Sequence, residues 1–287
     1  MPRLNNYLSL VKFSHTIFAM PFALIGFFLG LTKESETFTW TLLVKVVLCM
    51  IFARTAAMAF NRYADRHIDE QNERTRQREI PGGILSASSV LLLVIISAGL
   101  FIGVTYTINS ICFYLSPVAL LVVLGYSYTK RFTWLCHVVL GIGLSLAPIG
   151  AYLAVTGQFN WTPLLFSLTV ITWVSGFDII YALQDESFDR SAKLYSMPSN
   201  FGKSTALRIA RVLHISSAVF VISAGIYARF GLTYWIGALL FIGLLIFQHR
   251  LVRPTDLSRV NLAFFTTNGV ASIVFAIFVI AELLLFR

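Results

Sequence analysis

Residues 40–69 read WTLLVKVVLCMIFARTAAMAFNRYADRHID. The part before residue 61 is long and apolar enough for a membrane-crossing helix, which needs about 20 such residues. The part after it carries Asn61, Asp65 and Asp69 at intervals of four. Residues four apart share one face of a continuous helix. The stretch therefore predicts a membrane span that ends in a row of oxygen-bearing side chains.

The composition of the whole chain also indicates a membrane protein. Of its 287 residues, 57% are hydrophobic and 12% are charged, and the mean hydropathy is +0.78. A soluble domain carries about 25% charged residues, so an ordinary soluble globule and a disordered chain are both excluded. The three cysteines form no CxxC pair, which argues against a disulfide framework and a zinc site. We expect an all-α, polytopic membrane protein with a single membrane-embedded domain over residues 1–287.

Nine apolar runs are expected to span the membrane, at residues 14–31, 40–60, 88–108, 111–129, 134–155, 162–184, 207–228, 232–248 and 262–285. Of the 22 lysines and arginines, 17 fall in alternate connections that begin with the N-terminal segment. Because basic loops stay in the cytoplasm, we expect the N-terminus inside and the C-terminus outside. This asymmetry accounts for the net charge of +9, so no nucleic-acid partner is expected. Two similar halves are expected, residues 1–155 and 156–287.

A second row of carboxylates follows the sixth predicted span, on the same side of the membrane. Tyr181, Asp185 and Asp189 are again four apart. Like charges at this spacing repel, and carboxylate and amide oxygens select hard cations such as Mg²⁺, which also binds substrate phosphates. The two rows therefore predict a seat for Mg²⁺ and a diphosphate at the mouth of an apolar bundle. The alternative is two solvated helix ends, each with local pairing of aspartate and arginine.

Four motifs resemble those of the UbiA superfamily of intramembrane prenyltransferases. Residues 61–69 resemble its N-D-x-x-D-x-x-x-D motif, and residues 74–83 resemble the R-T-x-x-R-x-[LI]-P-x-G continuation. Residues 126–131 resemble its Y-x-x-x-K-R segment, and residues 181–189 its second acidic motif. The resemblance implies nine helices around a central cavity, two polar cytoplasmic loops over it, Mg²⁺ as the cofactor and a prenyl diphosphate as a substrate. Arg62 departs from the first motif, because 4-hydroxybenzoate prenyltransferases often have Asp there.

The resemblance also implies roles for individual side chains. Metal binding and catalysis are expected of Asn61, Asp65, Asp69, Asp185 and Asp189. Diphosphate binding is expected of Lys12, Arg74, Arg78, Lys130 and Arg131. Stabilisation of an allylic cation by cation–π contact is expected of Tyr126, Tyr152 and Tyr181. Acceptor binding is expected of Arg54, a charge within a span that needs a partner, and of Asp178, which either pairs with Arg54 or lines the same pocket.

The expected reaction is transfer of a polyprenyl group from a polyprenyl diphosphate to the ring carbon of an aromatic acid. The expected acid is 4-hydroxybenzoate, in quinone biosynthesis at a bacterial inner membrane. The first alternative is a naphthoate acceptor in the futalosine route to menaquinone, followed by haem, chlorophyll or glycerol-phosphate acceptors. A membrane transporter and a scaffold or receptor are the alternatives from other classes. The acidic residues cluster at one membrane face, whereas transporter sites lie near the midplane.

Other polar residues in or near the spans are expected to have structural or interfacial roles. The histidines His15, His137, His214 and His249 occur singly and are expected to be structural or interfacial. Glu282 lies near the end of the last predicted span and is expected to reach the membrane interface.

Overall fold

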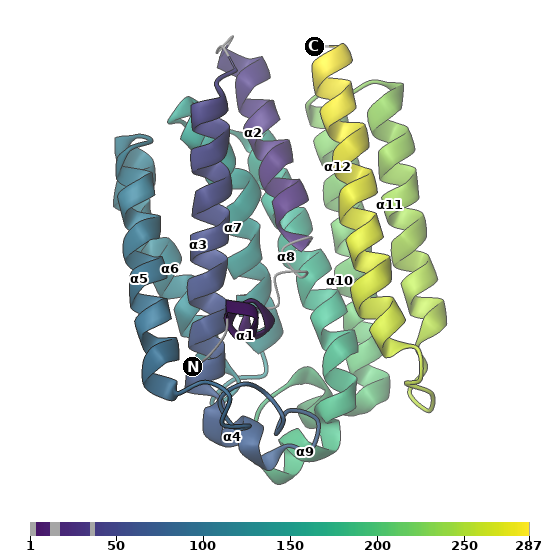
Figure 1. Ribbon diagram of the computed structural model, residues 1–287. Helices are drawn as coiled ribbons and strands as arrows, with labels where there is room; N and C mark the ends of the chain where they lie inside the picture. Colours follow the sequence, from purple (N-terminus) through teal and green to yellow (C-terminus); the bar gives the residue numbers. More distant parts are fainter. Residues whose placement is uncertain (1–3, 12–17, 35–37, 287) are drawn as a thin grey trace.

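The computed structural model describes residues 4–11, 18–34 and 38–286, which form a bundle of long helices (Figure 1). Within these ranges, eight helices are long and apolar enough to cross a membrane, and a ninth, shorter apolar helix covers Met20–Thr32. The predicted all-α membrane architecture is confirmed. The elements are α1 (Leu4–Leu10), α2 (Met20–Glu34), α3 (Trp40–Ala64), α4 (Arg66–Gln71), α5 (Ala87–Tyr106), α6 (Ser110–Thr129), α7 (Cys136–Thr156), α8 (Trp161–Ala182), η2 (Leu183–Asp185), α9 (Glu186–Ser191), α10 (Met197–Tyr227), α11 (Leu232–Leu251), η3 (Leu262–Thr267) and α12 (Asn268–Leu285).

The predicted spans agree with the observed helices except at the starts of α2 and α10. The first span was expected over residues 14–31, whereas α2 begins at Met20, and residues 14–17 lie outside the described residues. We expected α10 to begin at residue 207, whereas it begins at Met197. The Ser196 side chain accepts a hydrogen bond from the N–H of Ser199, and the Ser199 hydroxyl contacts the Ser196 backbone in return. This reciprocal cap starts the helix in a polar stretch that hydropathy alone does not mark. Gly202, with φ 76°, then bends α10 before its apolar part.

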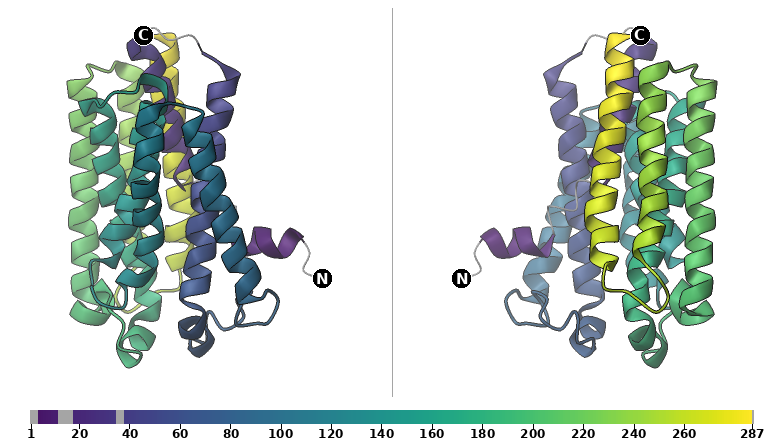
Figure 2. Two further views of the ribbon diagram at one scale, coloured as in Figure 1. Left: turned by 90° about the vertical axis from the view of Figure 1, so that its left-hand side faces the viewer. Right: turned by 90° about the vertical axis from the view of Figure 1, so that its right-hand side faces the viewer.

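The two polar segments lie at the same end of the bundle. Figure 1 shows α4 and α9 at this end and the C-terminus at the opposite end. Figure 2 shows α1 running crosswise to the long helices. Its Leu10 packs in an apolar cluster with Ala59 of α3 and Val90 of α5. The fold therefore brings together the two acidic rows, which are far apart in sequence, and places them at one end of the bundle's interior.

Close backbone contacts and an aromatic core hold the bundle together. A Cβ atom added to Gly26 of α2 would lie 2.0 Å from the carbonyl oxygen of Pro148 in α7, so only glycine fits there. Such contacts between small residues are typical of membrane helices. One helical turn before Gly26, Phe22 of α2 packs against buried Trp173 of α8 at 5.4 Å between ring centres. The Trp173 indole N–H donates to the Asn268 side chain at 3.0 Å.

Glu282 of α12 does not reach the interface as expected. Its side chain is buried, and Oε1 accepts a hydrogen bond from the N–H of Gly231 at 2.6 Å. Gly231 precedes the first residue of α11, where free N–H groups favour a negative charge. The expectation was wrong because the position of Glu282 in the sequence does not reveal that the start of α11 lies beside it.

Candidate active site

The first acidic row does not lie on one continuous helix, because the helix is broken at Asp65. α3 ends at Ala64, and Asp65 leaves the helical conformation with φ −92° and ψ 6° before α4 begins. The N–H of Asp65 still bonds the Asn61 carbonyl (2.9 Å), and the N–H of Asp69 bonds the Asp65 carbonyl (2.8 Å). The four-residue spacing thus survives the break. The Asn61 side-chain amide donates to Asp65 Oδ2 at 3.0 Å.

The second acidic row is built in a similar way. α8 ends at Ala182, and the tight turn η2 leads into α9. Tyr181 lies in the last turn of α8, Asp185 ends η2 and Asp189 lies within α9. The row therefore lies on three short pieces of helix that follow one another.

Each of the four predicted aspartates forms an ion pair with a different basic residue from the predicted diphosphate set. The shortest nitrogen–oxygen distances are 2.6 Å for Arg74–Asp185, 2.7 Å for Arg78–Asp69, 2.7 Å for Lys130–Asp189 and 3.3 Å for Arg131–Asp65. The pairs join the two polar segments to each other and to the end of α6. The predicted anionic and cationic residues therefore meet in one place and largely neutralise one another.

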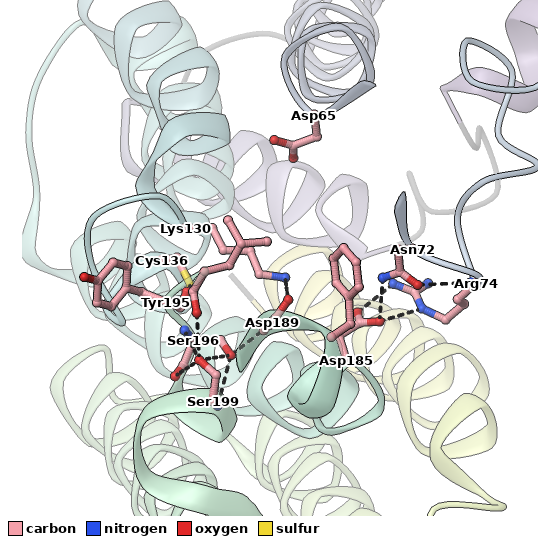
Figure 3. Close-up of polar contacts among 12 residues, drawn as sticks. Asp65, Asn72, Arg74, Lys130, Cys136, Asp185, Asp189, Tyr195, Ser196 and Ser199 are labelled. Atoms are coloured by element: carbon pink, nitrogen blue, oxygen red, sulfur yellow. Dashed lines mark hydrogen bonds and ion pairs between the residues drawn. The ribbon is translucent and has the colours of Figure 1, made fainter. Parts of the chain in front are cut away.

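The pairs on the second acidic row are the most firmly held (Figure 3). Arg74 donates to both Asp185 oxygens, at 2.9 and 2.6 Å, and the Asn72 amide adds a third bond at 3.3 Å. Burial opposes the charge of Arg74, but the bonds to Asp185 outweigh it and raise the pKa of Arg74.

Asp189 is fully buried, where it accepts from Ser196 Oγ at 2.9 Å and faces Lys130. Burial is the largest single effect and acts to lower the pKa of Lys130, but the attraction and hydrogen bond of Asp189, together with the charge of Asp185, raise it on balance. A buried carboxylate needs such partners to remain ionised.

Asp65 is the least neutralised of the four carboxylates. Its only basic partner in the described residues is Arg131 at 3.3 Å, and Figure 3 draws it apart from the other two pairs. Burial raises the pKa of Asp65, the nearby Asp69 raises it further, and Arg131 only partly opposes this. A carboxylate in this state gains from an added cation, because a positive charge relieves both the burial cost and the repulsion.

A cavity of about 250 Å³ leads from the acidic rows into the bundle. Its wall is apolar where Phe18, Met50, Phe177 and Phe264 face it. Seven residues of the predicted site or its first motif also line it, namely Arg54, Asn61, Arg62, Arg78, Tyr126, Asp178 and Tyr181. The Tyr181 ring stacks on Phe264 at 4.1 Å, and the Arg74 guanidinium lies 5.6 Å from the Tyr181 ring centre.

Two buried guanidinium nitrogens in this wall have no hydrogen-bond partner within the described ranges. They are Nε of Arg54 and Nε of Arg62. Arg54 precedes Asn61 by seven residues, which places it about 10 Å deeper along α3 at a rise of about 1.5 Å per residue. A buried donor without a partner is costly, so it is a position where a bound anion contributes binding energy.

The structure does not join Asp178 to Arg54. Asp178 Oδ2 lies 2.7 Å from His137 Nδ1 instead, while His137 Nε2 accepts from the N–H of Met197 at 3.2 Å. Since Nε2 accepts, the ring proton is on Nδ1 and is donated to the carboxylate. Asp178 still lines the cavity, as the second half of the expectation stated. His137 is therefore not a single, unpaired histidine.

The structure contradicts the expectation for Tyr152 and does not describe Lys12. Tyr152 does not line the cavity but is buried in the aromatic core around Trp173, so its predicted role in stabilising a cation is wrong. It lies near the end of α7 remote from the acidic rows, a distance that the sequence does not show. Lys12 lies outside the described residues.

His214 and His249 are not single either, because His249 Nε2 lies 3.0 Å from His214 Nδ1.

A second, larger cavity of about 330 Å³ lies between α3, α5, α6 and α7. Its lining is almost wholly apolar, and Met50 and Ala53 of α3 line both cavities. Leu115 and Val118 of α6 line it too and are 37% and 57% exposed, so the cavity reaches the outer surface of the bundle. The polar cavity therefore adjoins an apolar one that approaches the lipid-facing side.

Several residues at the site were missed by sequence reasoning. Asn72 and Ser196 hold Asp185 and Asp189, and His137 holds Asp178. Phe264 belongs to η3, a π-helical turn, and such turns are frequent at functional sites. The only available signals were the Ser-x-x-Ser cap at residue 196 and the polar composition after residue 71.

Comparisons with known proteins agree with this fold. A model of the UbiA prenyltransferase family matches residues 19–270. The 4-hydroxybenzoate octaprenyltransferase of Tolumonas auensis is 31% identical over 238 residues, which cover 83% of each chain. The apo structure of a UbiA homolog from Aeropyrum pernix K1 is 29% identical, with a TM-score of 0.85 over 94% of this chain and 98% of that one.

A UbiA homolog from Archaeoglobus fulgidus, solved with GPP and Mg²⁺, shares the fold at a TM-score of 0.75 and 21% identity, over 97% of this chain and 99% of that one. The family match covers most of the chain and bears out the prediction of an enzyme rather than a transporter or a scaffold. The chain belongs to the UbiA family of membrane-embedded prenyltransferases.

Proposed function

We propose that this prenyltransferase joins a polyprenyl group, supplied as its diphosphate, to the ring carbon of 4-hydroxybenzoate in quinone biosynthesis. The name of the Tolumonas auensis relative supports the acceptor. The observation that carries the proposal is the pairing of four aspartates with four basic residues at the mouth of a cavity whose inner wall holds Arg54. Such a mouth fits a metal-bound diphosphate, and such a wall fits a carboxylate.

The donor set fits Mg²⁺ bound together with the diphosphate. Asn61, Asp65 and Asp69 on one side, and Asp185 and Asp189 on the other, offer the oxygen ligands that this ion prefers. No group of three acidic, histidine or cysteine side chains in the described ranges is close enough to hold a metal by itself. Mg²⁺ typically uses one or two carboxylates and completes its coordination with water and substrate phosphate. When bound, Mg²⁺ supplies positive charge that stabilises the departing diphosphate.

The four basic partners are then available for the phosphates. Arg74 and Arg78 present forks of N–H donors, and Lys130 presents a compact charge, all within one mouth. With the aspartates holding Mg²⁺, these side chains would be free to pair with phosphate oxygens instead of carboxylates. Their charge then offsets the negative charge that grows on the leaving diphosphate as the allylic C–O bond breaks.

The prenyl tail is proposed to occupy the apolar cavity between α3, α5, α6 and α7. This cavity adjoins the polar one at Met50 and Ala53 and reaches the outer surface at Leu115 and Val118. A long apolar chain attached to a charged head needs this arrangement, because burial of each CH₂ group contributes about 0.8 kcal/mol. The head then lies at the acidic rows, while the tail runs toward the lipid.

The chemical step takes place in the apolar part of the polar cavity. The rings of Tyr126 and Tyr181 line it and can stabilise an allylic cation by cation–π contact. Arg54, whose Nε has no partner among the described residues, holds the acceptor carboxylate and so directs the ring carbon beside the hydroxyl toward the allylic carbon. That carbon attacks, and loss of its proton restores the aromatic ring.

A naphthoate acceptor is the second candidate, and Arg62 is the observation that favours it. This side chain is buried in the cavity wall, at a position where 4-hydroxybenzoate prenyltransferases often have Asp. The change replaces a negative charge with a positive one beside the acceptor space. Such a change of charge is expected where the acceptor is an aromatic acid other than 4-hydroxybenzoate.

The chain is proposed to reside in a bacterial inner membrane with α4 and α9 in the cytoplasm. The excess of lysine and arginine at this end supports that orientation. The proposed division into two similar halves, residues 1–155 and 156–287, places α2 to α7 in one half and α8 to α12 in the other.

The test is a transfer assay with membranes that contain the protein, a long-chain prenyl diphosphate, Mg²⁺ and either 4-hydroxybenzoate or a naphthoate. We expect 3-polyprenyl-4-hydroxybenzoate from the wild type, with none in EDTA and about 100-fold less or lower with Asp65→Ala. Glu73→Gln is the matched control, since this carboxylate is 90% exposed and outside the cavity. Product only with naphthoate would replace the acceptor, and no product with either would overturn the proposed function.

A further inference from the structure

A third cavity, of about 570 Å³, lies between the ends of α10 and α11 that are nearest to the polar loops. It shares no lining residue with the two substrate cavities. Arg208 and Arg211 of α10 line one side, one helical turn apart. Arg250 at the end of α11 and Arg253 just after it line the other side, next to His249. Four arginine side chains thus converge on one hollow.

Within the described residues, these arginines have little negative charge close to them. No acidic side chain lines the cavity, and none of the four guanidinium groups has an ion pair or hydrogen bond within the described residues. The nearby Asp256 is attracted by Arg253, but its side-chain hydrogen bonds come from the hydroxyl and N–H of Ser258 in its own loop. All four arginines are exposed. This differs from the acidic rows, where each basic residue has a carboxylate partner.

An apolar track leads away from the basic cavity along the outside of α10. Leu207 and Val252 form the apolar floor of the cavity. Beyond Arg208, spacings of four and three residues place a row of exposed side chains on one helix face, namely Val212, Ile215, Val219, Ile222 and Ile226. Each is at least 40% exposed, and in a membrane this face meets acyl chains. The cationic hollow and the apolar track together match a phosphate head joined to hydrocarbon tails.

We infer that the cavity between α10 and α11 binds the phosphate headgroup of an anionic phospholipid, whose acyl chains lie along the α10 track. Guanidinium forks match phosphate oxygens in geometry and charge. Basic pockets between membrane helices on the cytoplasmic side are suited to anionic headgroups. The apolar track distinguishes a lipid from free phosphate, because only a lipid contacts both features at once.

The rule that cytoplasmic loops are basic does not by itself account for this arrangement. Arg76 and Lys193 are also basic residues in loops at the same end of the molecule, yet neither lines the cavity. They therefore provide a matched control that removes the same number of charges from the same end. The comparison variants are Arg208→Gln/Arg250→Gln in the cavity and Arg76→Gln/Lys193→Gln outside it.

The experiment titrates phosphatidylglycerol against phosphatidylcholine on the purified full chain and counts bound lipids by native mass spectrometry. We expect the cavity variant to retain phosphatidylglycerol about 30-fold less tightly than the wild type, from the loss of two arginines near a lipid surface. The control variant should match the wild type. Thermal unfolding in phosphatidylcholine alone should be the same for all three proteins, which shows that the fold is intact.

Two soluble competitors, inorganic phosphate and glycerophosphoglycerol, distinguish the sources of the phosphate. Neither should displace the lipid at equal concentration, since neither contacts the apolar track. Displacement by either one would assign the cavity to a soluble phosphate and overturn the lipid site. Equal retention by the wild type and the cavity variant, or an equal loss in the control variant, would also overturn it.

Discussion

At the residue scale, the four aspartates of the acidic rows differ in how firmly each is held. Asp185 and Asp189 have short ion pairs and extra hydrogen bonds, whereas Asp65 has one basic partner at 3.3 Å. The pKa of Asp65 is raised by burial and by Asp69. Burial raises the pKa of Asp189 too, but its ion pair with Lys130 is closer, at 2.7 Å, so Asp65 has the most to gain from an added cation.

Replacing Asp65 by Ala should remove a direct ligand from the proposed metal site. We expect kcat/KM for prenyl transfer to fall by about 100-fold or more, the usual loss when a group that stabilises developing charge is deleted. The measurement is the initial rate of product formation at several Mg²⁺ concentrations. If excess Mg²⁺ restores the full rate, Asp65 affects only metal affinity, and if the rate never falls, the proposed site is wrong.

Arg54 makes a separate prediction about the acceptor. Replacing it by Gln should raise KM for 4-hydroxybenzoate by about tenfold or more, because a charge-assisted hydrogen bond to the carboxylate is lost. KM for the prenyl diphosphate should not change. The neutral analogue 4-hydroxybenzamide provides the matched comparison, since it should lose little. An equal loss with the acid and the amide would mean that Arg54 shapes the cavity without binding the carboxylate.

At the element scale, α2 and α7 make a close backbone contact at Gly26. The space beside Gly26 is filled by the Pro148 carbonyl, which belongs to the backbone and cannot rotate away. We expect Gly26→Ala to destabilise the protein by about 1–3 kcal/mol through overpacking. Gly99→Ala in α5 is the control, because nothing lies within 4 Å of the added Cβ.

Thermal unfolding in one detergent measures both glycine variants. Gly99→Ala should be neutral or stabilise by up to about 1 kcal/mol, the difference in helix propensity. Gly26→Ala should unfold at a clearly lower temperature. Equal unfolding temperatures would mean that α2 shifts along α7 at little cost, and the close contact would then not determine how the two helices pack.

The helices themselves could be predicted from the sequence, and so could the candidate ligands, but their partners could not. Hydropathy is a local property, and the spacing of Asp65 and Asp69 is visible in a few residues. The pairing of Asp185 with Arg74 spans 111 positions, and that of Asp178 with His137 spans 41. Such pairs depend on how helices are rotated against one another, and many rotations satisfy the same hydropathy pattern. Tyr152 was misassigned for the same reason.

At the scale of the whole molecule, the bundle has a polar end and a C-terminal end. We predict that the polar end faces the cytoplasm. In a cysteine-free background, Ser191→Cys at the end of α9 should resist a membrane-impermeant maleimide in intact cells. Thr107→Cys, exposed after α5 at the opposite end, should react. Both should react after permeabilisation, and the reverse pattern in intact cells would invert the topology.

The apolar cavity that adjoins the site at Met50 and reaches the surface at Val118 has a consequence for kinetics. A donor that enters from the bilayer meets the enzyme by diffusing in two dimensions. Its effective concentration is its mole fraction among lipids, not its amount per volume of buffer. Adding inert phospholipid to proteoliposomes, with total donor fixed and below saturation, should therefore slow transfer in proportion to the dilution. The rate per enzyme molecule should stay the same when the same proteoliposomes are placed in a larger volume of buffer.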